Sequence, residues 1–320
     1  PPMPTYKLVV EYQGTRYSGW QEQRNARTVA GELRAAAGRV AGEAPDVGGA
    51  GRTDAGVHAV GQVAHLRFRS PIDPEPFRRA LNDELPLDVH VAALAPAADN
   101  FHARHDAKLR SYVYQISRRR TPFARRFVWW VKRPLDPAAM AAAAALCQGK
   151  RDFAGFCERP ADQTSTIVVL DQALVVEEGG LILVRLAASH FLWKMARRMV
   201  GALVHVGAGE WRPEAMAALL DGTASPSLAA AVAEGTAPPS GLFLERVLYA
   251  GDAPLAPPSA PFPVAAEPVL AAAPPVRRPR EGTKPAGGAG RVEAKGPAPR
   301  HFAGAKRGPD GRPKPRPPRG

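Results

Sequence analysis

The sequence predicts an α+β protein in which two ferredoxin-like units join their sheets into one broad, mainly antiparallel sheet with the helices on one face. Two observations favour this fold. Segments with strand and helix patterns follow one another in the order β-α-β-β-α-β twice, and capping residues mark the start of several helices. No sequence repeat supports the duplication, so it depends on element order alone. We place the first unit at residues 1–105 and the second at residues 106–251.

Four segments of the first unit have the composition of strands: 5–12, 46–50, 61–68 and 88–95. Between the first two of them, Thr28 is a typical helix N-cap, and apolar residues at helical spacing follow it to Val40. The second helix begins at Asp73-Pro74, where a capping aspartate precedes a first-turn proline. The unit therefore has the order β-α-β-β-α-β.

The second unit has strand-like segments at 110–117, 166–176, 181–187 and 242–249, and the middle two are separated by the turn at 177–180. Asp136-Pro137 begins an alanine-rich helix that we expect to end near residue 147. A long helix from about 189 to 206 and a short one at 213–220 precede the last strand. The order of the first unit is repeated.

Residues 252–320 differ in composition from the rest of the chain. They hold 17 of the 34 prolines, and 13 Lys and Arg against 5 Asp and Glu. Such a segment buries too little apolar surface to offset its ordering entropy, so we predict a disordered basic tail. For its function, two interpretations remain open: the tail is a tether that binds RNA or another partner, or it is a solvated extension without a function of its own.

The charge of the whole chain indicates the kind of partner. A net charge of +13 favours a polyanion, because cations that neutralise phosphates release counterions. No apolar run approaches the roughly 20 residues of a membrane span, and no signal peptide is recognisable, so we expect a cytoplasmic protein without a membrane partner. His102, His105 and Asp106 lack further ligands at zinc spacing, which argues against a metal site.

The glycine-rich stretch from Gly49 to His65, GAGRTDAGVHAVGQVAH, places Arg52 and Asp54 in a permissive backbone. It matches neither phosphate-binding glycine motif, and no G-x-S-x-G occurs in the chain. By itself the stretch is compatible with a surface loop in which Asp54 makes a turn and Arg52 an ion pair.

The motif GRTDAGVHA in that stretch resembles the signature loop of the tRNA pseudouridine synthase A family. Further matches occur in the family's order, at 11–21, 81–89, 101–114, 149–153, 191–201 and 241–244. Together they cover about Tyr6 to Tyr249. Ala196 and Phe243 depart from the usual residues, in ways that a core tolerates.

This resemblance implies an isomerase that converts uridine to pseudouridine at positions 38, 39 and 40 of the tRNA anticodon stem-loop, as a homodimer without metal or cofactor. It also implies that Asp54 is the nucleophile, that Tyr112 lies against the target base, and that Arg197 is the active-site arginine. Arg52 is a candidate for filling the stack of a flipped base or for gripping the adjacent phosphate. Lys194 shares a helical stripe with Arg197 and is either a phosphate contact or part of a solvated basic face.

Two rival functions stay open from the residues alone. One is a non-catalytic RNA-binding protein or RNA chaperone on the same fold. The other is a hydrolase that releases uracil, which would need a second carboxylate from among Asp83, Asp88 and Asp106. The run from Arg118 to Trp130 mixes basic and aromatic residues, so it is a candidate RNA grip, although its tryptophans also suit a core.

Overall fold

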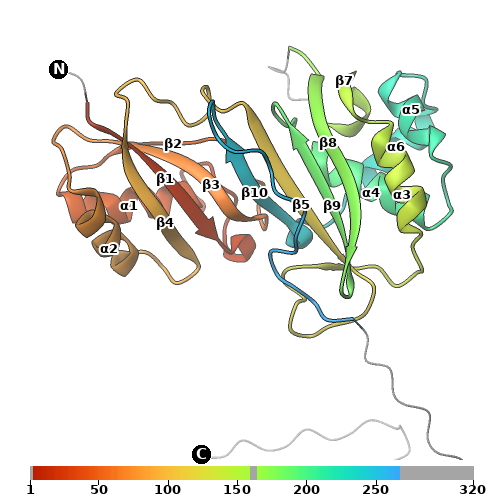
Figure 1. Cartoon of the computed structure of the whole chain (residues 1–320), viewed down its shortest axis with the longest axis horizontal. Coiled ribbons are helices and arrows are strands. Elements are labelled where there is room, and N and C mark those ends of the chain that lie inside the picture. The colour runs from red at the N-terminus through yellow and green to blue at the C-terminus, as the bar shows by residue number, and fades with distance from the viewer. Residues whose placement is uncertain (1–2, 159–163, 267–320) are drawn as a thin grey trace, which may run out of the picture. The chain divides into compact units, whose positions relative to one another are not determined.

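The computed structural model describes residues 3–158 and 164–266. The elements of the first half are β1 (Thr5–Tyr12), α1 (Val29–Ala41), β2 (Asp46–Gly49), β3 (His58–Arg67), α2 (Pro74–Glu84) and β4 (Val89–Ala97). The second half contains β5 (Leu109–Ser117), β6 (Trp129–Trp130), α3 (Pro137–Ala145), β7 (Gly149–Asp152), β8 (Ile167–Glu178), β9 (Leu181–Ala188), α4 (Met195–Gly207), α5 (Glu214–Leu220), α6 (Pro226–Glu234) and β10 (Leu242–Leu248). Figure 1 shows these elements.

The strands form one sheet in the order β4-β1-β3-β10-β5-β9-β8-β7, with β2 also paired to β3 and β6 to β5. The first half thus has the strand order β4-β1-β3-β2, and the second half has the equivalent order β10-β5-β9-β8. The halves join where β10 pairs with the start of β3 in parallel, with Phe243 opposite His58. The predicted α+β fold with a broad, mainly antiparallel sheet is confirmed.

The helices cover one face of this sheet. Alternate residues of β5 separate the two faces: Tyr112, Tyr114 and Ile116 belong to the large core shared with the helices, whereas Val113 belongs to a smaller cluster on the opposite face. Tyr112 therefore points into the layer between sheet and helices.

Several local predictions differ from the structure. The helix expected from about 189 is α4, which begins only at Met195, because Lys194 has a left-handed backbone with φ of 61°. The predicted helical stripe shared by Lys194 and Arg197 is therefore wrong, because Lys194 precedes the helix. The short elements β6, β7 and α6 were not predicted. Thr28 does cap α1, since its side chain accepts a hydrogen bond from Gly31 N.

Part of the expected disordered tail is ordered. Residues 256–266, which we call the strap, lie against the face opposite the helices. Phe262 N donates to Gln115 Oε1 at 2.9 Å, Gly180 N donates to Val264 O at 2.8 Å, and Val264 is buried. The prediction of disorder from 252 is therefore wrong for the strap, because its few apolar side chains find partners on the sheet. Residues 267–320 lie outside the described residues.

Candidate active site

Asp54 lies in the connection between β2 and β3, and the neighbouring backbone fixes this connection on both sides. Trp20 N donates to Thr53 O at 3.1 Å, and Gly56 N donates to Tyr17 O at 3.3 Å. The hydroxyls of Thr53 and Tyr12 are 2.8 Å apart in a buried hydrogen bond. The loop is thus held rigidly at the residues flanking Asp54, while the Asp54 side chain keeps 30% of its surface exposed.

Two glycines allow this close packing. A Cβ on Gly19, whose φ is +91°, would lie 2.4 Å from Thr53 O, and a Cβ on Gly49 would lie 2.4 Å from Trp20 Nε1. Neither position has room for a side chain. The glycine content of this region is explained by contacts with neighbouring backbone and with the Trp20 ring.

Arg197 of α4 reaches Asp54 from the second half of the molecule, with Nη1 3.4 Å from Asp54 Oδ2. Its guanidinium is also fixed by Nε, which donates to Ala237 O at 2.7 Å, and only 15% of its side chain is exposed. A partly buried guanidinium in this position restricts the rotamer of the Asp54 side chain. Residues that are far apart in the sequence therefore form one charged pair.

Tyr112 lies beside the same loop, since its hydroxyl would be 3.7 Å from a Cβ on Gly51. The ring is buried and packs edge-on against Phe191, with the centroids 4.8 Å apart. Burial raises the pKa of Tyr112, and the nearby Tyr12 and the Asp54 carboxylate raise it further. The tyrosine consequently stays protonated, and its ring lies beside the loop that carries Asp54.

Arg110 is a positioning residue whose role the sequence did not reveal. Its guanidinium donates to backbone carbonyls only: twice to Ala50 O, at 2.9 and 3.2 Å, and to Ala107, Ser189 and Arg104. It therefore ties the beginning of the Asp54 connection to the ends of β5 and β9. The sequence feature that could have indicated this role is the spacing of Arg110 and Tyr112, because residues two positions apart on a strand lie on the same face.

The other two predicted site residues are placed differently. Arg52 is exposed, and the part of the chain that the structure describes offers its side chain no hydrogen bond or ion pair. Lys194 forms an ion pair with Glu158, which Arg198 also approaches, with its Nη2 3.7 Å from Glu158 Oε2. The structure thus brings Asp54, Tyr112 and Arg197 together, leaves the Arg52 side chain exposed, and pairs Lys194 with Glu158.

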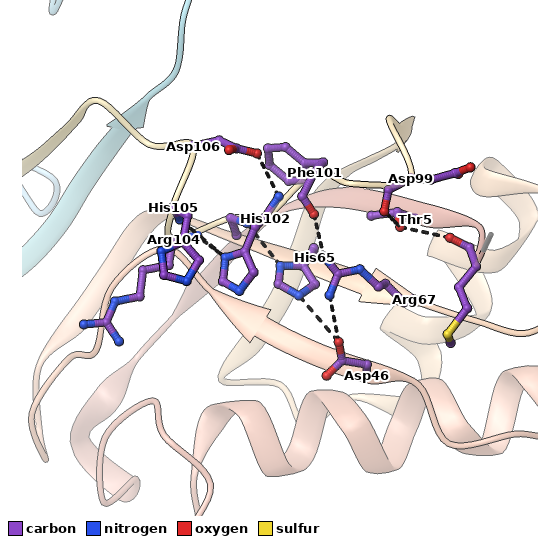
Figure 2. A network of polar contacts seen from close by, with 12 residues as sticks. Thr5, Asp46, His65, Arg67, Asp99, Phe101, His102, Arg104, His105 and Asp106 are labelled. Carbon is purple, nitrogen blue, oxygen red and sulfur yellow. Dashed lines mark hydrogen bonds and ion pairs between the residues drawn. The ribbon is translucent and has the colours of Figure 1, made fainter.

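Three histidines of the first half of the molecule, His65, His102 and His105, lie in a row (Figure 2). The ring centroids of His65 and His102 are 4.8 Å apart, and those of His102 and His105 are 4.2 Å apart. His102 Nδ1 accepts from the backbone N–H of Arg104 at 3.2 Å, and His65 Nδ1 accepts from Ala103 N–H at 3.1 Å. These backbone bonds explain the row, and no group of three metal-binding side chains occurs within the described residues.

The chain matches the model of a family described as "tRNA pseudouridine synthase" over residues 8–106 and 143–250. Both the Asp54 connection and α4 fall within the matched stretches. The chain belongs to the tRNA pseudouridine synthase family. The family expected from the sequence is confirmed, and the protein is an isomerase of the pseudouridine synthase class.

Curated relatives of this pseudouridine synthase are similar over nearly their whole length. The protein named "tRNA pseudouridine synthase A" from Rhodopseudomonas palustris (strain BisA53) is 44% identical over 68% of this chain and 90% of the relative. Its namesakes from Nitrobacter winogradskyi and Moorella thermoacetica are 41% and 42% identical, and the matches cover 98% and 100% of those proteins. In residues 3–158 and 164–266, no helix of this synthase is long and apolar enough to cross a bilayer.

Proposed function

We propose that the enzyme isomerises uridine to pseudouridine at positions 38, 39 and 40 of the tRNA anticodon stem-loop, with Asp54 as the nucleophile. The observation that carries the proposal is the 3.4 Å pair between Asp54 and Arg197 beside the buried Tyr112 ring. A carboxylate, its cationic partner and an aromatic surface are the groups that this reaction needs. They come from both halves of the molecule.

The reaction breaks the bond between ribose C1′ and uracil N1 and forms one between C1′ and C5. The proton leaves C5, N1 gains one, and no oxidant or water is consumed. Asp54 attacks either C1′, as the carboxylate of a retaining glycosidase does, or the uracil ring. In both routes Arg197 orients the carboxylate of Asp54 through their contact, and Asp54 is regenerated unchanged at the end.

Tyr112 holds the base while it turns. A uracil stacked on the Tyr112 ring keeps its plane while it rotates from N1 to C5, and the edge-on contact with Phe191 fixes that ring. The raised pKa of Tyr112 keeps the hydroxyl neutral, so that it adds no second negative charge beside Asp54. A tyrosine that stays neutral can therefore stack on the uracil without repelling the Asp54 carboxylate.

A stacked uridine reaches Asp54 only after its nucleotide is flipped out of the helix. Arg52 is exposed two residues before Asp54, where its guanidinium can fill the vacated stack or bind the adjacent phosphate. Lys194 helps to hold the start of α4, the helix that carries Arg197, through its ion pair with Glu158.

We expect tRNA to bind a homodimer, in the cytoplasm. The net charge of +13 supports an RNA substrate, and the names of the relatives specify tRNA. Broad positive surface favours recognition of tRNA shape over readout of one base sequence.

The test uses unmodified tRNA carrying tritium at uracil C5. The wild-type enzyme should release tritium and leave pseudouridine in the digested product. A matched tRNA in which uridines 38, 39 and 40 are replaced by cytidine should release none. Release of free uracil would instead identify a hydrolase, and release from the replaced tRNA would contradict the proposed positions.

A further inference from the structure

A basic and aromatic loop, residues 118–133, connects β5 to α3 and includes β6. Figure 1 shows it beside the blue strap, at the end of β5 that is farther from Leu109. The contacts agree with this view, because the Phe127 and Phe262 rings stack with centroids 4.5 Å apart. The catalytic proposal makes no use of this loop.

The sheet fixes the loop from beneath. Ala124 and Val128 are buried in the small cluster opposite the helices, together with Val113 of β5. Gln115 Nε2 donates to Phe127 O at 2.8 Å. A loop held in this way loses little conformational entropy when a ligand binds to its outer side.

The outer side carries an apolar ring among cations. Phe123 is 88% exposed, which is unusual for so large an apolar side chain. Next to it is a hollow lined by Arg120, Thr121, Pro122, Arg125, Val128 and Trp130. The guanidinium of Arg120 lies 5.9 Å from the Trp130 ring centroid, and Lys132 Nζ lies 5.6 Å from it.

Within the described residues, some cations of the loop are paired with carboxylates and others are not. Arg118 and Arg133 pair with Glu177 and Glu210. By contrast, within residues 3–158 and 164–266 no carboxylate lies at ion-pair distance from four other cations of the loop: Arg120, Arg125, Arg126 and Lys132. Unpaired cations beside exposed aromatic rings fit nucleic acid, whose phosphates and bases match both features.

The loop is also attached to the strand that follows the nucleophile. His58, four residues after Asp54, bonds through Nε2 to Arg126 O at 2.9 Å, and its ring centroid is 5.3 Å from that of Phe127. The loop is therefore joined directly to the strand that begins four residues after Asp54.

We propose that Phe123, Arg120 and Arg125 form a second RNA contact, separate from Asp54, Tyr112 and Arg197, which binds phosphates and one unstacked base of the same tRNA. The inference rests on the proposed tRNA substrate. Phe123 stacks on the base, and the two arginines bind the phosphates on either side of it. The contact adds affinity without taking part in the isomerisation.

The experiment measures equilibrium binding of full-length unmodified tRNA to the full chain carrying Asp54→Asn, over a range of salt concentrations. Phe123→Ala should raise Kd roughly tenfold through lost stacking, and Phe123→Trp should restore the affinity. Arg120→Gln combined with Arg125→Gln should lower the slope of log Kd against log salt by about 1.5, because each phosphate contact contributes about 0.7–0.9.

The matched control combines Arg79→Gln with Arg212→Gln. Both arginines are exposed and lie on or beside helices, and the two substitutions remove the same net charge as the loop variant. It should leave the salt slope unchanged. The proposal is overturned if the loop variants, with unaltered thermal unfolding, match the control in both Kd and salt slope. Tritium release by the wild-type chain would then still support the catalytic proposal, since the binding assay involves no turnover.

Discussion

The two halves of the molecule share a strand order but differ in one connection. In the first half, residues 50–57 connect β2 to β3 and carry Asp54. In the second half, the equivalent connection between β8 and β9 is only Gly179 and Gly180, a tight turn in which Gly179 has φ of 56°. The chemistry that we propose therefore depends on the length and sequence of one connection, which the strand order does not determine.

The second half contributes in another way. It supplies Tyr112 from β5 and Arg197 from α4, and Arg110 ties β5 to the start of the Asp54 connection. The duplicated fold thus divides the site into a loop that presents the carboxylate and a framework that orients it.

The largest effect concerns the strap, which covers the tight turn of the second half. A chain ending at residue 251 loses the contacts of Phe262 with Phe127 and Gln115, and of Ala256 with Arg185. We expect its free energy of unfolding to fall by about 3–5 kcal/mol, from lost apolar burial and unpaired polar groups. Urea denaturation measures this.

The matched control is a chain ending at residue 266, which keeps the strap. It should unfold within about 0.5 kcal/mol of the full chain and keep its turnover at saturating tRNA. Equal stability of the two truncated chains would contradict the role of the strap.

A second effect tests the hairpin that carries Asp54. His65 on β3 is buried against Gly48 of β2, and burial, with a further contribution from Arg67, lowers its pKa to about 4. In the unfolded chain a histidine has a pKa near 6.5, so the unfolded state binds the proton first as the pH falls. Stability is therefore complete above about pH 6.5 and is lost progressively toward pH 4.

The size of this loss follows from the pKa difference. Between pH 7 and pH 4.5 the wild type should lose about 2–3 kcal/mol more than His65→Gln, measured by urea unfolding at both pH values. All other titrating groups are the same in the two proteins, so their contribution cancels when the two pH dependences are subtracted. An identical pH dependence of the two proteins would exclude His65 as the titrating group.

The third effect concerns the pair between the halves. Arg197→Met should lower kcat about 10- to 100-fold, the value of a charge-assisted hydrogen bond of about 1.5–3 kcal/mol. Arg197→Lys keeps the charge but cannot bind Ala237 O and Asp54 together, so its kcat should be intermediate. A kcat of Arg197→Met within twofold of wild type would show that Arg197 does not contribute to catalysis.

The smallest effect separates the ring of Tyr112 from its hydroxyl. Within the described residues the hydroxyl makes no hydrogen bond, so Tyr112→Phe should change kcat/KM less than about threefold. Tyr112→Ala removes the stacking surface, worth about 1–3 kcal/mol, and should cost roughly 10- to 100-fold. Equal losses in the two variants would assign the function to the hydroxyl instead.

The order of the main elements could be predicted because it depends on local patterns. Thr28 and Asp136 mark helix starts through their own side chains, each of which caps the following helix. The start of α4 could not be predicted, because periodicity does not reveal the left-handed backbone of Lys194. The order of the strap could not be predicted for a different reason. Its composition is rich in proline, and the partners of its apolar side chains Phe262 and Val264 are distant in the sequence.

The candidate site shows the same limit. A resemblance to a family suggested Asp54, Tyr112 and Arg197, but no local pattern indicates that residues 54 and 197 meet. Their pair depends on β3 and β10 lying side by side and on the packing of α4 against the sheet. Arg110 acts entirely through backbone carbonyls that only the folded chain brings together.

The most direct test of the account is a single-turnover measurement with Asp54→Asn at saturating tRNA. Asparagine has nearly the shape of aspartate but no charge to act as nucleophile. The account predicts that the variant binds tRNA as tightly as wild type and forms no pseudouridine. Pseudouridine formation at a rate near that of wild type would show that Asp54 is not the nucleophile.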